Sequence, residues 1–263
     1  MAAAIGIRMG SAKEATVPQV RIEDTTDWVQ AGWADFKKAP IISTFSGGAY
    51  VLVGYAIVLW LQSVGLSSFL LPVMSGFMIV APLFAVLFYE IARMQAEGAE
   101  IDYGAAVKSS FTNIGQLAIV GFVLMLVMMV WLMLAMVIFS VFFGGTPPGL
   151  EGFYESLISQ PQTPAFLIVG TAVGGVLAAI AFAVSAISMP MIVSENISAF
   201  DAMAFSIAAV TSNPRVMISW AAVLVLLTGC GMATFFIGLA VTLPVAGYAS
   251  WHAYKSFRPN GNA

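Results

Sequence analysis

A run of 51 residues without Asp, Glu, Lys or Arg, at positions 39–89, constrains this chain more than any other feature. As one α-helix the run would be about 76 Å long, whereas a hydrocarbon core about 30 Å thick needs about 20 residues. The run therefore predicts two membrane spans with a turn between them. Charged residues make up only 9% of the chain and hydrophobic residues 60%, against roughly 25% charged in soluble domains. A water-soluble globular fold is excluded on this ground.

Two later uncharged runs, residues 109–150 and 216–254, indicate further spans. The first holds one span before a turn rich in Gly and Pro, and the second suits two short spans broken near Cys230. With the apolar segment between the two runs, we predict an all-α polytopic transmembrane helical bundle. The six expected spans are residues 41–61, 69–90, 115–142, 166–192, 216–231 and 233–253. A re-entrant segment, shielded by protein, is the alternative for the short fifth span.

The cationic residues predict the orientation of these spans. All ten lie in four segments on one side of the six-span arrangement: Arg8, Lys13, Arg21, Lys37 and Lys38; Arg93 and Lys108; Arg215; and Lys255 and Arg258. Because Lys and Arg are retained on the cytoplasmic side during insertion, we expect a multi-pass protein of the bacterial inner membrane with both termini cytoplasmic. Residues 1–25 are expected to be a mobile tail, residues 26–256 the membrane domain and residues 257–263 a C-terminal tail.

An internal repeat is indicated by residues 27–40 and 201–214, which both run from Asp to Pro over the same length. Both place apolar residues at the same offsets, and this spacing makes one helix face: Val29, Trp33 and Phe36; Met203, Ile207 and Val210. A weaker third copy starts at Asp102. The predicted organisation is three units, each an amphipathic helix followed by a transmembrane hairpin. The alternative is that Asp caps, corner prolines and interfacial aromatics are common in any polytopic protein.

Three stretches carry a resemblance to a known family: DWVQAGWADFKKAP, YVLVGYAIVLW and APLFAVLFYEIAR, which begin at residues 27, 50 and 81. They resemble a bacterial family of predicted integral membrane proteins of unknown function, and the resemblance extends over about residues 27–258. It implies a topology and no reaction. Some members have carried a respiratory-oxidase label, but a haem–copper catalytic subunit needs several histidine ligands, and this chain has only His252.

The candidate functional residues lie at the ends of the predicted spans or at their prolines. Glu90 with Arg93, and separately Glu195, could admit a proton or cation at the membrane edge; the alternative is an interface anchor, with a local pair between Glu90 and Arg93. His252 could hold haem or sense pH, or it could be an interfacial residue. The remaining candidates are prolines that free backbone carbonyls for a solute, or that only shape helix packing: Pro82, Pro190 and Pro244.

Composition narrows the classes of function. The net charge of −3 provides no basic surface for nucleic acid, and one Cys and one His cannot form a disulfide framework or a site with several imidazoles. We expect no catalytic residue, cofactor or metal ligand. The leading hypothesis is a non-enzymatic accessory, assembly or scaffold component that acts through helix packing. A carrier or channel for a small neutral or lipidic solute is the alternative, and an accessory partner of a respiratory complex is the third. The expected partners are the lipid bilayer and a membrane protein, including a second copy of the chain.

Overall fold

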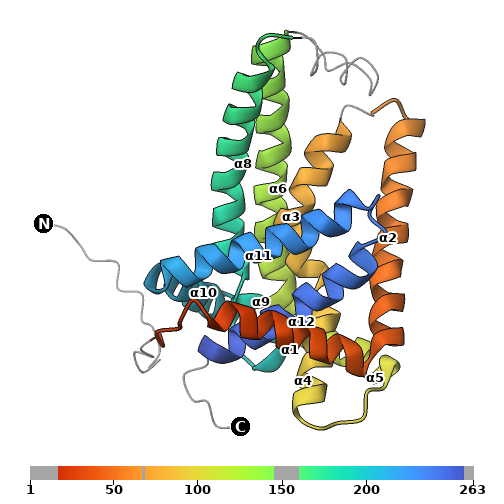
Figure 1. Cartoon of the computed structure of the whole chain (residues 1–263), viewed down its shortest axis with the longest axis vertical. Helices are drawn as coiled ribbons and strands as arrows, with labels where there is room; N and C mark the ends of the chain where they lie inside the picture. Colours follow the sequence, from red (N-terminus) through yellow and green to blue (C-terminus); the bar gives the residue numbers. More distant parts are fainter. Residues whose placement is uncertain (1–16, 67–68, 145–159, 258–263) are drawn as a thin grey trace, which may run out of the picture.

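The computed structural model describes residues 17–66, 69–144 and 160–257, which form α-helices and connections with no strand among them (Figure 1). The helices in chain order are α1 (Asp24–Lys38), α2 (Pro40–Ser63), α3 (Leu70–Phe84), α4 (Val86–Ala96), α5 (Tyr103–Ser110), α6 (Ile114–Phe143), α8 (Thr163–Ser185), α9 (Ser188–Ser194), α10 (Ala199–Ser212), α11 (Pro214–Ala233) and α12 (Leu239–Phe257). The predicted all-α class is confirmed. Glu151 and Glu155, which lie between the third and fourth predicted spans in the sequence, are outside the described residues.

By length and composition, five helical segments of the described chain can cross a membrane, and they correspond to the first five predicted spans. They are Pro40–Ser63, Pro72–Ala96, Ile114–Phe143, Thr163–Ser194 and Pro214–Ala233. A multi-pass helical membrane protein is therefore confirmed. The predicted sixth span corresponds to α12, which is not among these five segments.

α12 carries polar residues although most of its residues are buried inside the bundle. It carries His252 and Lys255, yet 13 of its 19 residues are buried, and it packs against α1, α2, α4 and α11. Polar side chains at membrane depth are tolerated where protein surrounds them. The low hydrophobicity of α12 therefore fits a helix that is enclosed by other helices and not by lipid.

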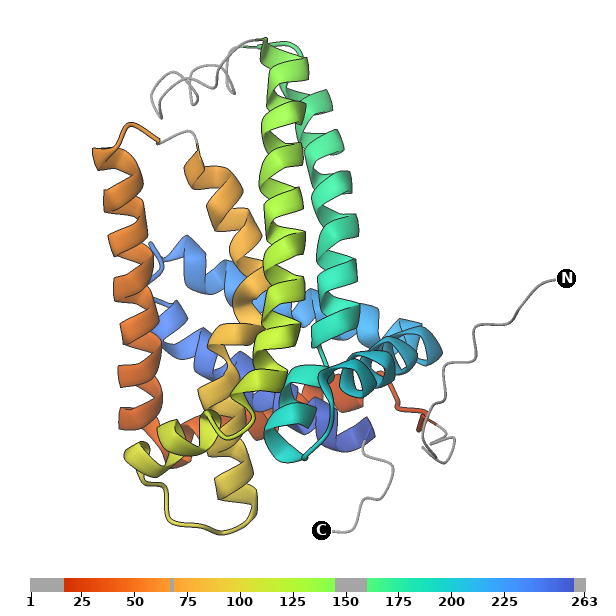
Figure 2. The same ribbon diagram turned by 180° about the vertical axis from the view of Figure 1, so that it is seen from behind.

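The hairpin of α11 and α12 inclines across the upright helices and has its tip beside α2 (Figures 1 and 2). The Tyr55 hydroxyl of α2 donates to the carbonyl of Phe235, which is in the turn between α11 and α12. Tyr55 lies eight residues, or about 12 Å, before α2 ends at Ser63. Phe235 and Phe236 both have positive φ, +52° and +66°, which is costly for bulky side chains. The tip thus lies deep along α2 without reaching its far end, which favours the re-entrant alternative for this region.

Two of the predicted spans are broken by irregular backbone. Pro82 removes an N–H donor, and the second span divides into α3 and α4 at Ala85. The fourth span divides between α8 and α9, where Ser206 of α10 accepts from the Ile187 N–H at 3.2 Å and donates to the Ala183 carbonyl at 2.7 Å. In a membrane such breaks need internal hydrogen-bond partners. α10 provides these partners for the second break.

α1 and α10 cover the predicted apolar face only in part. Trp33 is 45% exposed and Ile207 is 42% exposed, whereas Phe36 is buried, and an interfacial helix can leave such apolar side chains to the lipid. The buried positions of the two helices are in matching register, and apart from Trp28 they hold small or polar residues: Thr25, Trp28, Gly32 and Asp35 in α1; Ala199, Ala202, Ser206 and Ala209 in α10. At Gly32 an added Cβ would lie 2.7 Å from the Ala249 nitrogen of α12. In membranes, small residues let helices approach closely while large apolar side chains remain available to lipid.

The short helices gather at one end of the bundle. Figures 1 and 2 show α1, α4, α5, α9 and α10 at the lower end. The described cationic residues are in or next to these helices, or at the adjoining ends of α11 and α12: Arg21, Lys37, Lys38, Arg93, Lys108, Arg215 and Lys255. A short helix also precedes each pair of long helices, as the three-unit prediction requires, although the repeat itself stays a prediction.

The predicted mobile tail of residues 1–25 extends too far along the chain. The Val20 N–H donates to the Asn213 Oδ1 at 3.0 Å, and the Asn213 Nδ2 donates to the Pro18 carbonyl at 3.1 Å. Thr25 is already inside α1 and buried. Residues 17–23 therefore pack against the corner between α10 and α11.

The depth of the hairpin tip can be measured at Cys230, the single cysteine of the chain, which is exposed near the end of α11. We predict that a nitroxide attached to Cys230, in protein reconstituted into bilayers, is more accessible to oxygen than to a water-soluble nickel chelate. A nitroxide at Lys37→Cys, in a Cys230→Ala background, is the water-facing control. Greater nickel than oxygen accessibility at Cys230 would place the tip in water and contradict this depth.

Candidate functional site

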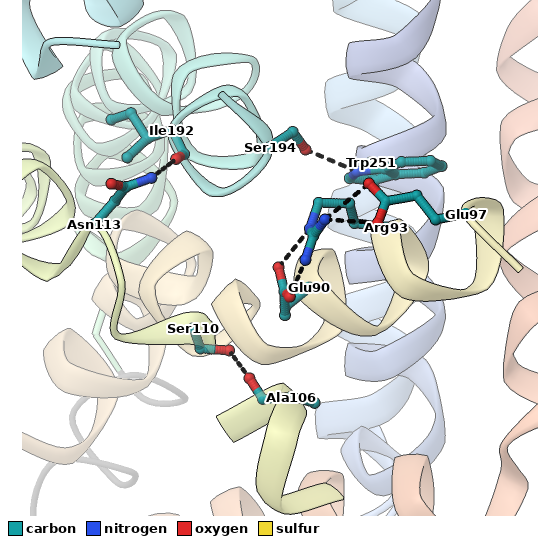
Figure 3. A network of polar contacts seen from close by, with 9 residues as sticks. All are labelled: Glu90, Arg93, Glu97, Ala106, Ser110, Asn113, Ile192, Ser194 and Trp251. Carbon is teal, nitrogen blue, oxygen red and sulfur yellow. Dashed lines mark hydrogen bonds and ion pairs between the residues drawn. The ribbon is translucent and has the colours of Figure 1, made fainter. Parts of the chain in front are cut away.

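The predicted pair of Glu90 and Arg93 is present, but inside the protein. Glu90 is 1% exposed. Two guanidinium nitrogens of Arg93 donate to the two carboxylate oxygens of Glu90, at 2.6 and 2.9 Å. Arg93 also donates to Glu97 at 2.8 Å (Figure 3). A buried carboxylate is stable when a hydrogen-bonded cation compensates it. Glu90 and Arg93 therefore form an ion pair within α4 that has a structural role, and both carboxylate oxygens of Glu90 accept hydrogen bonds from Arg93.

The end of α12 is attached to α9 by two further polar contacts. Glu195, just after α9, accepts from the Tyr254 hydroxyl at 2.5 Å. The Trp251 Nε1 donates to the Ser194 Oγ at 3.1 Å (Figure 3). The predicted candidate Glu195 therefore contacts an aromatic residue of α12 and takes part in holding this helix against α9.

His252 faces an acid that the sequence patterns did not single out. Its Nε2 lies 2.7 Å from the Asp35 Oδ2, and the Lys38 Nζ donates to the other Asp35 oxygen at 2.8 Å. Burial acts to raise the pKa of Asp35, but its hydrogen bonds to His252 and Lys38 outweigh burial and hold this pKa below the ordinary value. Asp35 thereby connects α1 to α12 through a charged contact.

An apolar cavity of about 560 Å³ lies between α3, α8, α11 and α12 in the described structure. Its walls are mostly alanine, glycine and branched aliphatic side chains, and they include Pro82. A volume of this size is within the usual range of small-molecule sites. Pro190 and Pro244 are buried in α9 and α12 and are not wall residues. Of the seven predicted candidates, only Pro82 lines this cavity.

Few polar atoms of the cavity wall are available to a ligand. The hydroxyls of Ser185, Ser250 and Thr211 each donate to a carbonyl of their own helix. Tyr89 lines the cavity and is 3% exposed, and within the described part of the chain its hydroxyl has no hydrogen-bond partner. The cavity therefore offers the hydroxyl of Tyr89 as a donor within a mostly apolar surface.

The cavity opens sideways between α8 and α11. Its wall residues on these helices include exposed ones, such as Gly175 and Ala178 on α8 and Ile218 and Val225 on α11. Both helices belong to segments that can span a membrane. An opening between two membrane-spanning helices would face bilayer hydrocarbon.

Residues 70–194 match the model of a family described as "Predicted integral membrane protein (DUF2189)", which confirms the expected family resemblance over this segment. The match includes Glu90, Arg93 and the α3 and α8 walls of the cavity, whereas α10, α11 and α12 lie beyond it. No curated protein and no solved structure matches the chain.

The contact between Asp35 and His252 is expected to stabilise the docking of α1. Asp35→Asn should cost about 1–3 kcal/mol, because it weakens a buried, charge-assisted hydrogen bond. Asp35 has a lowered pKa in the folded state, so its contribution is present at neutral pH. It should be lost as the pH falls through that pKa, below the ordinary 3.8.

Thermal unfolding of purified protein in detergent, measured at several pH values, tests this expectation. Asp27→Asn is the matched control, since Asp27 is an exposed acid on the same helix. Equal unfolding temperatures for the two variants at neutral pH would contradict the assigned role of Asp35.

Proposed function

We propose that this protein binds a lipidic solute in the cavity between α3, α8, α11 and α12 and acts as a carrier, without catalysing a reaction. The observation that carries the proposal is the apolar volume of about 560 Å³ between helices, open toward the side. An acyl chain can enter it from the bilayer without crossing water. Of the functions expected from the sequence, a carrier for a lipidic solute is the one for which this cavity offers a binding site.

Affinity for such a ligand must come from packing and from the few polar contacts. Lipid tails are as apolar as the cavity wall, so transfer from bilayer to cavity gains no hydrophobic free energy of the kind found in water. Close packing against alanine and glycine provides dispersion contacts. The Tyr89 hydroxyl adds a hydrogen bond that the surrounding hydrocarbon lacks.

A carrier fits the position of the cavity better than a channel does. On α3 the wall starts at Met78 and continues to the break near Ala85, and on α8 it starts at Gly175. These are the halves of the two helices that adjoin α4 and α9. The cavity therefore lies in one half of the bundle and is not a passage between its two ends.

We further infer that the cationic end faces the cytoplasm of a bacterium, because Lys and Arg are retained on that side during insertion. The matching buried register of α1 and α10 supports the similarity of the first and third units, and the hairpin of α11 and α12 returns to the end where it starts. The scaffold role and the respiratory partnership stay predictions, which the co-purification of a specific membrane protein would support.

Filling the cavity from α8 should displace the ligand. Gly175 lines the cavity, and a Cβ added there would have open space around it, with no contact within 4 Å. Gly175→Phe can therefore place its ring in the cavity without a backbone clash. We predict that this variant retains much less co-purifying lipid than the natural protein, as measured by native mass spectrometry from mild detergent.

Gly170→Phe is the matched control for this experiment. Gly170 is on the same helix, is equally open around its Cα, and is not a wall residue. It should retain lipid as the natural protein does. Equal lipid retention by the two variants, both folded by size-exclusion chromatography, would refute binding in the cavity.

A further inference from the structure

Arg215 is a cation without a counterion among the described residues. It is not a wall residue itself but follows Pro214, a wall residue where α10 meets α11, and we call this part of the cavity its polar end. Arg215 is exposed in the first turn of α11, and no described carboxylate forms an ion pair with it. Other arginines of the same end are neutralised: Arg21 by Asp24 at 3.3 Å, and Arg93 by Glu90 at 2.6 Å. The positive charge of Arg215 is therefore available to a ligand.

Arg215 is placed beside the cavity by its neighbours in α11. Pro214 precedes it and Ile218 follows one turn later, and both are wall residues. Thr211, at the end of α10, continues the wall on the same side. The N–H groups and dipole at the start of α11 add to the positive potential there. The polar end of the cavity thus favours an anionic group.

Tyr89 provides an independent indication of a ligand. The residue is only 3% exposed, and its hydroxyl lacks a partner within the described chain while its side chain lines the cavity. A buried hydroxyl without a hydrogen bond costs free energy. An ester or phosphate oxygen of a lipid can accept this hydrogen bond, which a plain hydrocarbon tail cannot do.

Resting on the proposed carrier function, we infer that the ligand is an anionic phospholipid, with an acyl chain in the cavity, a lipid oxygen at Tyr89 and the anionic headgroup at Arg215. The headgroup lies at the cationic end of the bundle, and the chain extends toward the middle of the membrane. This is the orientation of a lipid in the leaflet at that end. The lipid can therefore enter between α8 and α11 without inverting.

The test titrates the purified full-length protein in mild detergent with phosphatidylglycerol or phosphatidylcholine that carry the same acyl chains. Bound lipid is counted by native mass spectrometry. The natural protein should prefer phosphatidylglycerol. Arg215→Gln should lower this preference about fivefold, the effect of about one surface cation on an anionic lipid. Lys37→Gln removes another exposed cation that has no ion pair within the described chain, and it should leave the preference unchanged.

A second variant tests the hydrogen bond to a lipid oxygen separately from the recognition of the headgroup charge. Tyr89→Phe should lower the affinity for both lipids about equally, because both carry ester and phosphate oxygens. The expected loss is about fivefold, the effect of one hydrogen bond. An unchanged preference in Arg215→Gln, or no preference in the natural protein, would overturn the headgroup assignment and leave the cavity proposal intact. If the natural protein binds neither lipid better than Gly175→Phe does, the carrier proposal itself fails.

Discussion

Hydrocarbon offers no hydrogen bonds to the groups that it surrounds, and the structure of this protein follows from that constraint. α12, which carries His252 and Lys255, is enclosed by four other helices. The break between α8 and α9 is bridged by Ser206, and the buried Glu90 is held by Arg93. Each of these polar features has a partner inside the protein. Other buried side-chain atoms have no hydrogen-bond partner among the described residues: Ser46 Oγ, Gln95 Oε1, Trp220 Nε1 and Thr242 Oγ1. Tyr89 differs from these residues because it lines the cavity.

Much of the architecture could be predicted from charge and hydrophobicity alone. Uncharged runs located five helices that can span a membrane, and the described cationic residues do gather at one end of the bundle. The weakest prediction concerned the last two spans. A helix enclosed by protein need not be strongly hydrophobic, and the tip of its hairpin lies beside Tyr55 without reaching the end of α2. Composition does not distinguish such a hairpin from a pair of short crossing helices.

Helix faces and the candidate site were less predictable. The apolar period in α1 marks one face but does not show which residues pack against other helices. Gly32 and Asp35 are buried because α12 approaches closely and contacts Asp35 through His252. A rule learned from water-soluble helices places large apolar residues inside, and the bilayer removes the reason for it. Tyr89 was not among the candidate residues taken from the sequence. Its place in a cavity depends on how α3, α8, α11 and α12 pack, which local sequence patterns do not encode.

The cavity connects these observations to a function. Its walls come mostly from helices that can span a membrane, and exposed wall residues lie on α8 and α11. Its polar end lies beside the exposed Arg215. The central claim is that a lipid occupies this space. A cryo-electron microscopy structure of the full chain in nanodiscs containing phosphatidylglycerol tests this claim most directly. We predict elongated density that enters between α8 and α11 and reaches the Tyr89 hydroxyl. A cavity closed by repacked side chains, with ordered lipid only outside the helices, would contradict it.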